Sequence, residues 1–379
     1  MLTRRRLASL ALAGLTPLMG TLPAQAASKK HGSKRAAGRP VLGKAYGRRA
    51  DAVALANRLA QVHGLDAAWT RAQLAQAHFV AQVTQLIMPP PVGVAKNWGA
   101  YRDRFIEPKR VQAGVRFWQD NEAWLAQAEQ RYGVPASVVV GIIGVETFYG
   151  RITGQFRVLD ALATLSLDFP KGRSDRSAFF QDELGQYLAL VHREQIDPLS
   201  VKGSYAGAIG LGQFMPGSIN RFAVDFDGNG HIDMAGSAAD VIGSVAHYLA
   251  EHGWQRGLPT HFAVVPPAAG SPGLQALQAP DIKPSFTPAQ LAELGAELAT
   301  AGREHPGKLA LVTLQMGDAE PVYVAGTDNF YAVTRYNWSA YYALGVIELG
   351  QAVAQARQAL LSAPAGVPAA PAASAASKP

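Results

Sequence analysis

Apolar residues recur every three to four positions over most of the chain, which predicts a mainly helical protein. The segments with this spacing are 51–62, 67–74, 111–132, 240–253 and 341–361. The region 262–333 differs, because Pro and Gly interrupt short β-like runs there. These runs are 264–265, 309–314, 322–324 and 331–333, with one helical insert over 288–300. We therefore expect a mainly α (α+β) fold, a helical body with a small β-containing subdomain.

One predicted helix is apolar on all its faces. The run 138–145 contains no polar side chain, so this helix should be central and buried. Glu146 breaks the run, just before Gly150 can end the helix. The negative end of the helix dipole and burial would both raise the pKa of that carboxyl group, which suits protonation of a glycosidic oxygen near neutral pH. The residues alone fit equally well with a helix-end glutamate paired to Arg151 or Arg157.

The two ends of the chain lack a pattern that builds a core. Residues 1–26 contain Arg4–Arg6, an apolar stretch and Ala24-Gln25-Ala26, which predicts a signal peptide of the Sec or twin-arginine type. Residues 27–50 are predicted to be a disordered basic linker, and residues 363–379 a disordered Ala/Pro tail. We expect a soluble protein in the periplasm.

Charge and cysteine content exclude several classes of protein. The formal charge is +7, but residues 1–50 hold 11 Lys/Arg and no Asp/Glu, which leaves 24 Lys/Arg against 28 Asp/Glu in the rest. A basic folded surface for nucleic acid is therefore not expected. The absence of cysteine excludes disulfides, a thiolate nucleophile and a lipoprotein anchor. No run outside the signal peptide approaches the length of a transmembrane segment.

Four longer motifs follow one another along the chain. They are Gly-Ile-Ile-Gly-Val-Glu-Thr-Phe-Tyr-Gly at 141–150, Leu-Asp-Ala-Leu-Ala-Thr-Leu-Ser at 159–166, Lys-Gly-Ser-Tyr-Ala-Gly-Ala-Ile-Gly-Leu-Gly-Gln-Phe-Met-Pro at 202–216 and Asn-Phe-Tyr-Ala-Val-Thr-Arg-Tyr-Asn at 329–337. With these motifs the chain resembles the lytic murein transglycosylase B family over 97–254 and 328–356. The resemblance implies a lysozyme-like catalytic core over 134–258, after a helical N-terminal part over 51–133. The small β-containing subdomain and the C-terminal helix would then occupy 259–362.

The resemblance also implies a reaction. The family cleaves the β-1,4 bond between N-acetylmuramic acid and N-acetylglucosamine in peptidoglycan glycan strands, as a lyase that forms a 1,6-anhydro end. Glu146 would be the single general acid and base. A hydroxyl group on the same sugar has a high effective molarity, so neither a bound water nor a second carboxylate is needed. No cofactor is required for this chemistry.

Further residues are assigned to the substrate by the same resemblance. Ser204 and Gln213 match residues that contact the N-acetyl group and ring hydroxyls, and Tyr101 matches a cleft tyrosine. Phe148 and Phe214 are candidates for stacking on sugar rings. The opposite wall of the cleft would contain Tyr336, Asn337 and Tyr342. Arg173 or Arg176 would face lactyl or peptide carboxylates, and the sequence leaves open which of the two does.

A calcium loop is predicted over residues 225–240. Asp225, Asp227 and Asn229 occupy the positions of the first three oxygen ligands of an EF-hand, His231 would supply its backbone carbonyl, and Asp233 stands at the ninth position. Gly236 stands where the closing glutamate belongs, so the motif is irregular. The family resemblance implies a longer loop closed by a later carboxylate, for which Asp240 is the candidate. Calcium would brace the loop, and the alternative is an Asx-rich turn without metal.

Other functions stay open at this point. A hydrolytic muramidase would pair Glu146 with Asp160 or Asp168 as second carboxylate. A noncatalytic peptidoglycan-binding scaffold and a calcium sensor are further alternatives. We expect a monomer that binds glycan strands. Complexes for cell-wall synthesis or division are further candidate partners.

Overall fold

The computed structural model describes residues 40–89 and 96–362. The predicted signal peptide, most of the predicted linker and the predicted C-terminal tail lie outside the described residues. Within the two described ranges, no helix is both long and apolar enough to cross a membrane.

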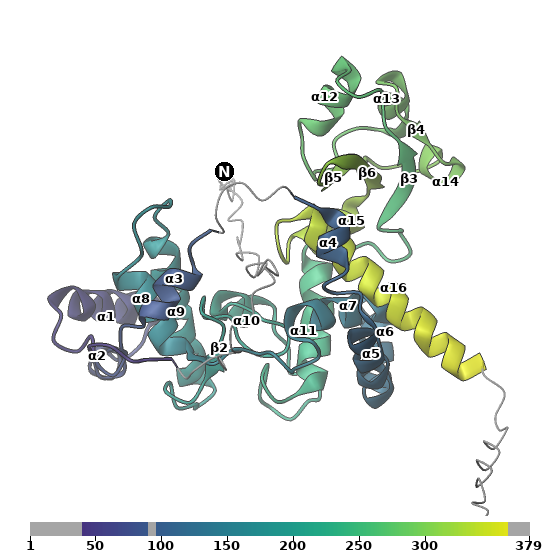
Figure 1. Ribbon diagram of the computed structural model, residues 1–379. Coiled ribbons are helices and arrows are strands. Elements are labelled where there is room, and N and C mark those ends of the chain that lie inside the picture. Colours follow the sequence, from purple (N-terminus) through teal and green to yellow (C-terminus); the bar gives the residue numbers. More distant parts are fainter. Residues whose placement is uncertain (1–39, 90–95, 363–379) are drawn as a thin grey trace, which may run out of the picture.

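One side of the molecule is a group of helices drawn at the left of Figure 1. They are α1 (Ala50–His63), α2 (Ala67–Ala75), α3 (Ala81–Leu86), α8 (Val158–Leu167) and α9 (Ser177–Arg193). Helix α9 packs against both α1 and α8, and α3 lies on α8. The predicted helices over 51–62 and 67–74 are confirmed as α1 and α2.

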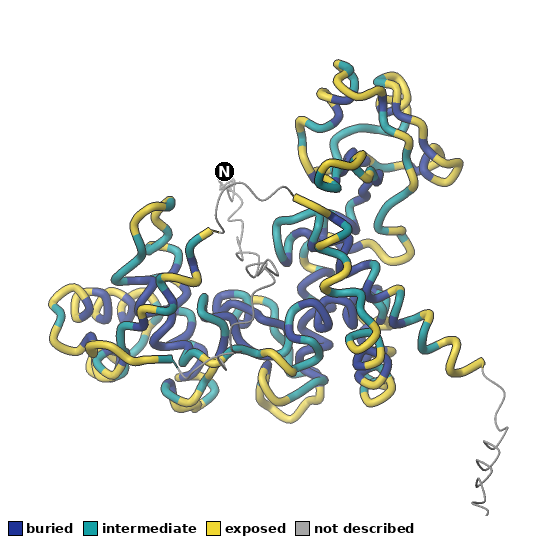
Figure 2. Tube along the Cα trace, viewed as in Figure 1, coloured by how far each residue is buried: buried dark blue, intermediate teal, exposed yellow. Residues whose placement is uncertain are grey.

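The other side is built around α7 (Ala136–Thr147), which is buried along nearly its whole length. Its neighbours are α5 (Pro108–Asp120), α6 (Glu122–Tyr132), α11 (Ala238–Glu251) and α16 (Ala340–Ser362). Helix α16 comes so close that a Cβ atom on Gly141 would lie 2.2 Å from the carbonyl oxygen of Val346. Figure 2 shows this part of the body as mostly buried chain. The predicted central apolar helix is therefore confirmed.

Several short elements complete the body. They are α4 (Trp98–Arg102), α10 (Pro216–Phe222), α15 (Asp328–Thr334), and the antiparallel pair β1 (Phe156–Arg157) and β2 (Lys202–Gly203). Helix α4 lies against α16, and α10 packs on α9.

A small subdomain lies at the upper right of Figure 1. Its antiparallel sheet has the order β4 (Glu297–Leu298), β3 (His261–Val265), β6 (Ala319–Gly326), β5 (Ala310–Met316). Helices α12 (Pro272–Gln278), α13 (Pro288–Glu293) and α14 (Thr300–Arg303) complete it around a separate apolar core. The β5–β6 hairpin contacts the body, because the amide of Gln315 donates to the hydroxyl of Tyr341 at 2.7 Å.

Four predicted features differ from the structure. The predicted strand at 331–333 is helical as part of α15, where the Thr327 side chain caps the helix by accepting from the amide of Asn329. The predicted insert over 288–300 is helical only to Glu293. The periodic segment 111–132 is divided at Asn121 into α5 and α6. The C-terminal helix packs on α7 and belongs to the helical body, not to the β-containing part.

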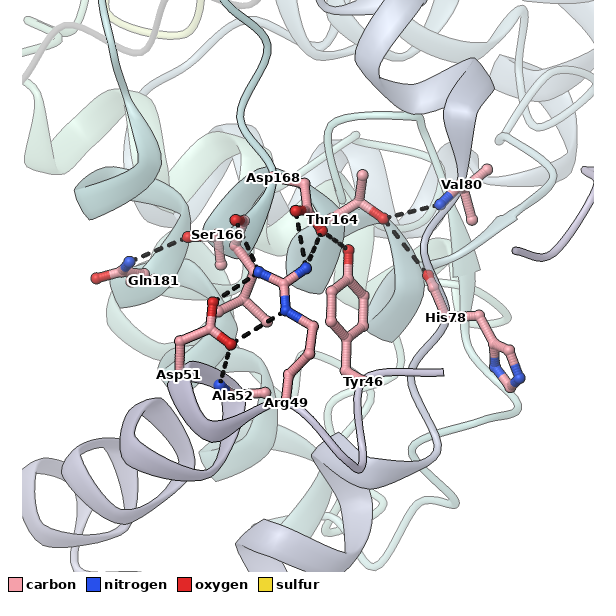
Figure 3. Close-up of polar contacts among 11 residues, drawn as sticks. Tyr46, Arg49, Asp51, Ala52, His78, Val80, Thr164, Ser166, Asp168 and Gln181 are labelled. Carbon is pink, nitrogen blue, oxygen red and sulfur yellow. Dashed lines mark hydrogen bonds and ion pairs between the residues drawn. The ribbon is translucent and has the colours of Figure 1, made fainter. Parts of the chain in front are cut away.

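The folded body also begins before the predicted boundary at residue 51. Tyr46 is only 1% exposed, and its hydroxyl group donates to Asp168 at 2.6 Å. The Arg49 guanidinium group pairs with both Asp168 and Asp51 (Figure 3). These contacts attach the end of the predicted linker to α8, because a buried aromatic ring and an ion pair outweigh its basic, Gly-rich composition.

Candidate active site

A pocket lies between the two helical sides, and both contribute to its walls. Its lining residues are Ile87, Tyr101, Arg104, Phe105, Val145, Glu146, Ile152, Gly154, Phe156, Arg176, Phe179, Phe180, Ser204, Tyr205, Ala206, Gln213, Met215, Asn337 and Tyr342. Most of these side chains are apolar or aromatic, and Glu146 is the one carboxylate among them.

Glu146 projects into this pocket from the last turn of α7. The helix ends there because Phe148 and Tyr149 adopt left-handed backbone conformations, with φ of 53° and 57°. Two consecutive non-glycine residues in this region are unusual and strained, and such strain is typical of functional sites. The helix therefore ends two residues earlier than the predicted stop at Gly150.

Burial and one hydrogen bond set the pKa of Glu146. Removal from water raises the pKa to about 7, while the hydroxyl of Tyr342 donates to Oε1 at 2.6 Å and acts in the opposite direction. No described residue donates a hydrogen bond to Oε2. Arg157 pairs with Asp160, and Arg151 lies over the ring of Phe148, so neither arginine forms the ion pair considered for Glu146.

Tyr342 is held in place by a second tyrosine behind it. The rings of Tyr336 and Tyr342 are stacked, with centroids 6.3 Å apart and an interplanar angle of 12°. The hydroxyl of Tyr336 donates to the carbonyl of Gly212, and its side chain is 7% exposed. Tyr336 therefore supports the cleft wall from behind and does not line the pocket, in contrast to its predicted contact with substrate.

The Gly-rich loop contributes two of the predicted polar residues to the pocket. Gln213, with φ of 51°, donates from Nε2 to the carbonyls of Thr153 and Gly210 at 3.1 and 2.9 Å. Its amide oxygen is thereby directed away from those carbonyls and can accept a hydrogen bond. Ser204 Oγ accepts from two backbone amides of its own turn, so its hydroxyl hydrogen can be donated to a ligand.

The predicted stacking residues Phe148 and Phe214 lie outside the pocket lining. Phe214 is 2% exposed and packs edge-on against Tyr248 and Tyr336 in the core. Phe148 is covered by the guanidinium groups of Arg110 and Arg151. Neither ring therefore lines the pocket, because each side chain packs against protein groups.

Of the two candidate arginines, Arg176 lines the pocket. Its guanidinium group lies 4.5 Å from the ring centroid of Phe179, and burial lowers its pKa. Arg173 instead donates to the carbonyl of Ile87 and lies over Phe169. Tyr101 and Asn337 line the pocket as predicted, and the pKa of Tyr101 is raised by burial and, to a smaller extent, by the negative charge of Glu146.

The carboxylates proposed for a hydrolytic mechanism are used elsewhere. Asp160 is 1% exposed, pairs with Arg157 and accepts from the amide of His78 at 2.8 Å. Asp168 binds Arg49 and Tyr46 (Figure 3). Neither side chain lines the pocket.

The predicted calcium loop brings three carboxylates together. Oxygen atoms of Asp225, Asp227 and Asp240 lie within 4.8 Å of one another. The two Asp240 oxygens accept from the amides of Phe226 and Asp233, which turns this buried carboxylate toward the loop. The Asn229 side chain accepts from the amide of His231, whose own side chain is 72% exposed. The loop also contacts the Gly-rich loop, because the carbonyl of Met234 accepts from the amide of Leu211 at 3.1 Å, two residues before Gln213.

Sequence reasoning did not identify several residues of the site. The missed pocket residues include Arg104, Phe105, Ile152, Phe156 and Met215. Arg104 and Phe105 lie in the same short segment as Tyr101. Because Tyr101 was predicted to lie in the cleft, these two neighbours could have been predicted there as well. Glu183 was also missed; it is 4% exposed, accepts from the amide of Gly217 at 2.7 Å, and burial raises its pKa to about 7. It does not line the pocket.

Comparison with known proteins gives three similarities over most of the chain. Residues 48–351 match the family described as transglycosylase SLT domain. Membrane-bound lytic murein transglycosylase B of Escherichia coli (strain K12) is 41% identical over 309 residues, which cover 79% of this chain and 82% of that protein. The structure of Escherichia coli lytic transglycosylase Slt35 in complex with calcium has a TM-score of 0.73 and 40% identity, over 84% of this chain and 96% of that one.

A third relative was solved with a reaction-related ligand. SltB3 from Pseudomonas aeruginosa, in complex with NAG-anhNAM-pentapeptide, has a TM-score of 0.67 and 28% identity. The match covers 82% of this chain and 80% of that one.

Proposed function

The chain belongs to the transglycosylase SLT domain family, whose members are lyases acting on peptidoglycan, and we propose that Glu146 is its single catalytic acid and base. The reaction is cleavage of the bond from N-acetylmuramic acid to N-acetylglucosamine, with formation of a 1,6-anhydro end. The main support for this proposal is that Glu146 is the one carboxylate among the lining residues of the pocket, and that its pKa is raised.

In the first step Glu146 acts as an acid. With a pKa of about 7, a large share of its side chains is protonated near neutral pH. Because Oε1 accepts from Tyr342, Oε2 is the atom that holds the transferable proton. The proton passes to the glycosidic oxygen, the bond from C1 to that oxygen breaks, and the 4-hydroxyl group of N-acetylglucosamine leaves.

In the second step the Glu146 carboxylate acts as a base. It removes the proton from the C6 hydroxyl of the muramoyl sugar, whose oxygen then bonds to C1 and closes the anhydro ring. The proton returns to the carboxyl group, so the enzyme is regenerated without water. The hydrogen bond from Tyr342 stabilises the carboxylate that exists between the two steps.

The remaining polar side chains of the pocket orient the sugars. We assign contacts with N-acetyl and hydroxyl groups to the Ser204 hydroxyl, the Gln213 amide oxygen and Asn337. Arg176 is assigned to a carboxylate of the substrate, since it is the arginine of the predicted pair that reaches the pocket.

A pair of glutamine variants tests the catalytic assignment. Glu146→Gln removes the transferable proton, so we expect release of muropeptides from purified sacculi to fall at least about a thousandfold. Glu183→Gln is the matched control, because it changes the other buried carboxyl group with a pKa of about 7 outside the pocket. Equal activity of Glu146→Gln and wild type would refute the assignment, and loss in both variants would indicate general misfolding.

We further propose that the three-carboxylate loop binds calcium. Its donors are oxygen atoms, which a hard cation prefers, and a relative was crystallised with calcium. Asp225, Asp227 and Asp240 would hold the ion together with Asn229, and His231 would contribute its backbone carbonyl. The ion would brace the loop whose Met234 carbonyl binds Leu211, two residues before Gln213, and it takes no part in the chemistry.

Export is the last part of the proposal. The N-terminal pattern supports removal of residues 1–26 and action in the periplasm, where peptidoglycan lies. Mass spectrometry of protein from the periplasmic fraction would find Ala27 as the first residue, whereas full-length protein retained in the cytoplasm would contradict export.

A further inference from the structure

Arg104 lines the pocket and follows helix α4 by two residues, whereas Arg176 directly precedes α9. Figure 1 shows these two helices in different parts of the body. The guanidinium carbon of Arg104 is 5.0 Å from the ring centroid of Tyr101, which itself lines the pocket. The positive charge also acts on that ring, because it opposes the rise in the pKa of Tyr101. Arg104 is exposed, so its charged group faces the solvent of the cleft.

The charge of Arg104 is not neutralised by the protein. Arg102 pairs with Glu348, and Arg110 donates to the carbonyl of Gly144. Arg104 has no carboxylate within ion-pair distance among the described residues, and its side chain forms no hydrogen bond with them. The contact with Tyr101 leaves the donor groups of the guanidinium fork available to a ligand.

The balance of charge in the pocket favours an anionic ligand. Two lining residues are arginines, and the one lining carboxylate must be protonated when it acts as an acid. An arginine fork binds carboxylates through paired, charge-assisted hydrogen bonds. The uncompensated charge of Arg104 thus offers one place in the cleft for an acidic group.

We propose that Arg104 binds a carboxylate of the glycan strand, beside Tyr101 and separately from the Arg176 contact. This inference rests on the proposed function, and it adds that the enzyme prefers strands whose acidic substituents reach Arg104. Lactyl groups and stem peptides both supply such carboxylates. Arg104 is then a binding residue that sets substrate preference, and it takes no part in proton transfer.

The test combines removal of the positive charge of Arg104 with removal of the negative charges of the substrate. Arg104→Gln is compared with wild type on soluble peptidoglycan strands and on the same strands after their carboxylates have been amidated. Arg151→Gln is the matched control, because Arg151 is an exposed arginine that also covers an aromatic ring, at 4.8 Å from Phe148, but does not line the pocket. KM and kcat are measured at low and high salt.

On native strands we expect Arg104→Gln to raise KM about tenfold with little change in kcat, as for loss of a charged hydrogen bond. Salt should weaken the binding of wild type more than that of the variant. On amidated strands the two proteins should have nearly equal KM, and Arg104→Lys should lie between them on native strands. Strands stripped of stem peptides retain lactyl carboxylates, so an unchanged effect there assigns the contact to the lactyl group.

Two results would overturn the inference. One is an unchanged KM in Arg104→Gln on native strands, and the other is the same loss on native and amidated strands, which would indicate a structural role. In both cases wild type is active and forms anhydro products. If instead wild type formed no anhydro product, the proposed function itself would fail, so the two failures can be told apart.

Discussion

Burial and a hydrogen bond act on the pKa of Glu146 in opposite directions, and a mutation that removes the hydrogen bond separates the two effects. Burial raises the pKa to about 7, and the Tyr342 hydroxyl limits the rise. Because the acid form starts the reaction, kcat should fall as the pH rises through this pKa, by about tenfold per unit at higher pH. The hydroxyl of Tyr342 therefore sets where the alkaline limb of the pH profile begins.

Tyr342→Phe should move that alkaline limb to higher pH. The variant loses the donor that stabilises the carboxylate, so Glu146 stays protonated over a wider range, while kcat at the optimum falls because Oε1 is no longer held. Initial rates of muropeptide release between pH 4 and 9 measure the shift. Tyr341→Phe is the control on the same helix, since its hydroxyl contacts Gln315 and not Glu146. A limb that stays in place would contradict the role of Tyr342.

The raised pKa also implies that Glu146 destabilises the fold. In the unfolded chain the carboxyl group has its ordinary pKa of 4.5, whereas in the folded protein its pKa is about 7. Above pH 4.5 the unfolded state therefore loses this proton before the folded state does. Deprotonation then stabilises the unfolded state relative to the folded one. Glu146→Gln should therefore raise the free energy of unfolding by about 1–3 kcal/mol at pH 8, allowing for partial exposure. Denaturant titrations at pH 8 and pH 4 check this, since the gain should vanish at the lower pH. A gain independent of pH would contradict the ionisation argument.

Single residues of the site differ in how far the sequence could predict them. Glu146 could be found because a carboxylate at the end of an apolar helix breaks a strong pattern. Phe214 and Tyr336 could not be excluded, because each is the chain neighbour of a pocket residue, Gln213 and Asn337. The direction of a side chain in a loop depends on backbone angles such as the φ of 51° at Gln213, which periodicity does not encode.

At the scale of elements, the close contact of α7 and α16 holds the acid and its hydrogen-bond donor together. Glu146 lies on α7 and Tyr342 on α16, so the distance between them depends on how closely these helices pack. Glycine permits this approach, because a Cβ atom at Gly141 would lie 2.2 Å from a carbonyl oxygen of α16.

Gly141→Ala should therefore destabilise the protein by about 1–3 kcal/mol, as expected for overpacking, and should lower kcat by separating Glu146 from Tyr342. Gly99→Ala is the control in helix α4, where a Cβ atom would meet its nearest neighbours at 3.4 and 3.5 Å. Because alanine favours helix more than glycine, that variant should be unchanged or slightly more stable. Thermal unfolding and steady-state rates test both, and equal stability of the two variants would contradict the packing argument.

Long periodic helices were predictable, and so were the strands at the runs 309–314 and 322–324, whereas the segment 331–333 was not. Helices α1, α11 and α16 follow from their three-to-four spacing. Residues 331–333 resemble a strand locally, but a threonine cap and burial of Phe330 make the segment helical. Tertiary packing outweighs local propensity in such short runs.

At the scale of the whole molecule, the pocket is assembled from parts far apart in the sequence. Its walls come from the α9 side, the α4 side and the Gly-rich loop, and the loop that we propose to bind calcium contacts the last of these through Met234 and Leu211. The irregular spacing to Asp240 could be anticipated only through family resemblance, since the closing position of a regular EF-hand is Gly236.

Calcium should therefore stabilise the folded chain without being required for proton transfer. A ligand at a hundredfold excess over its Kd adds about 2.7 kcal/mol, so the Tm should rise with calcium concentration and fall on addition of EDTA. Asp227→Asn should abolish the rise. Asp233→Asn should retain it, because Asp233 caps the amides of Ala235 and Gly236 and lies outside the three-carboxylate cluster. A Tm independent of calcium in wild type would contradict the proposed site.

Digestion of sacculi in heavy-oxygen water tests the central claim, that Glu146 alone cleaves the strand without a water molecule. Mass spectrometry of the released muropeptides should find 1,6-anhydro ends that carry no heavy oxygen. The same products should be missing with Glu146→Gln and present with Glu183→Gln. Reducing muramic acid ends that contain heavy oxygen would show hydrolysis, and would contradict the single-carboxylate mechanism.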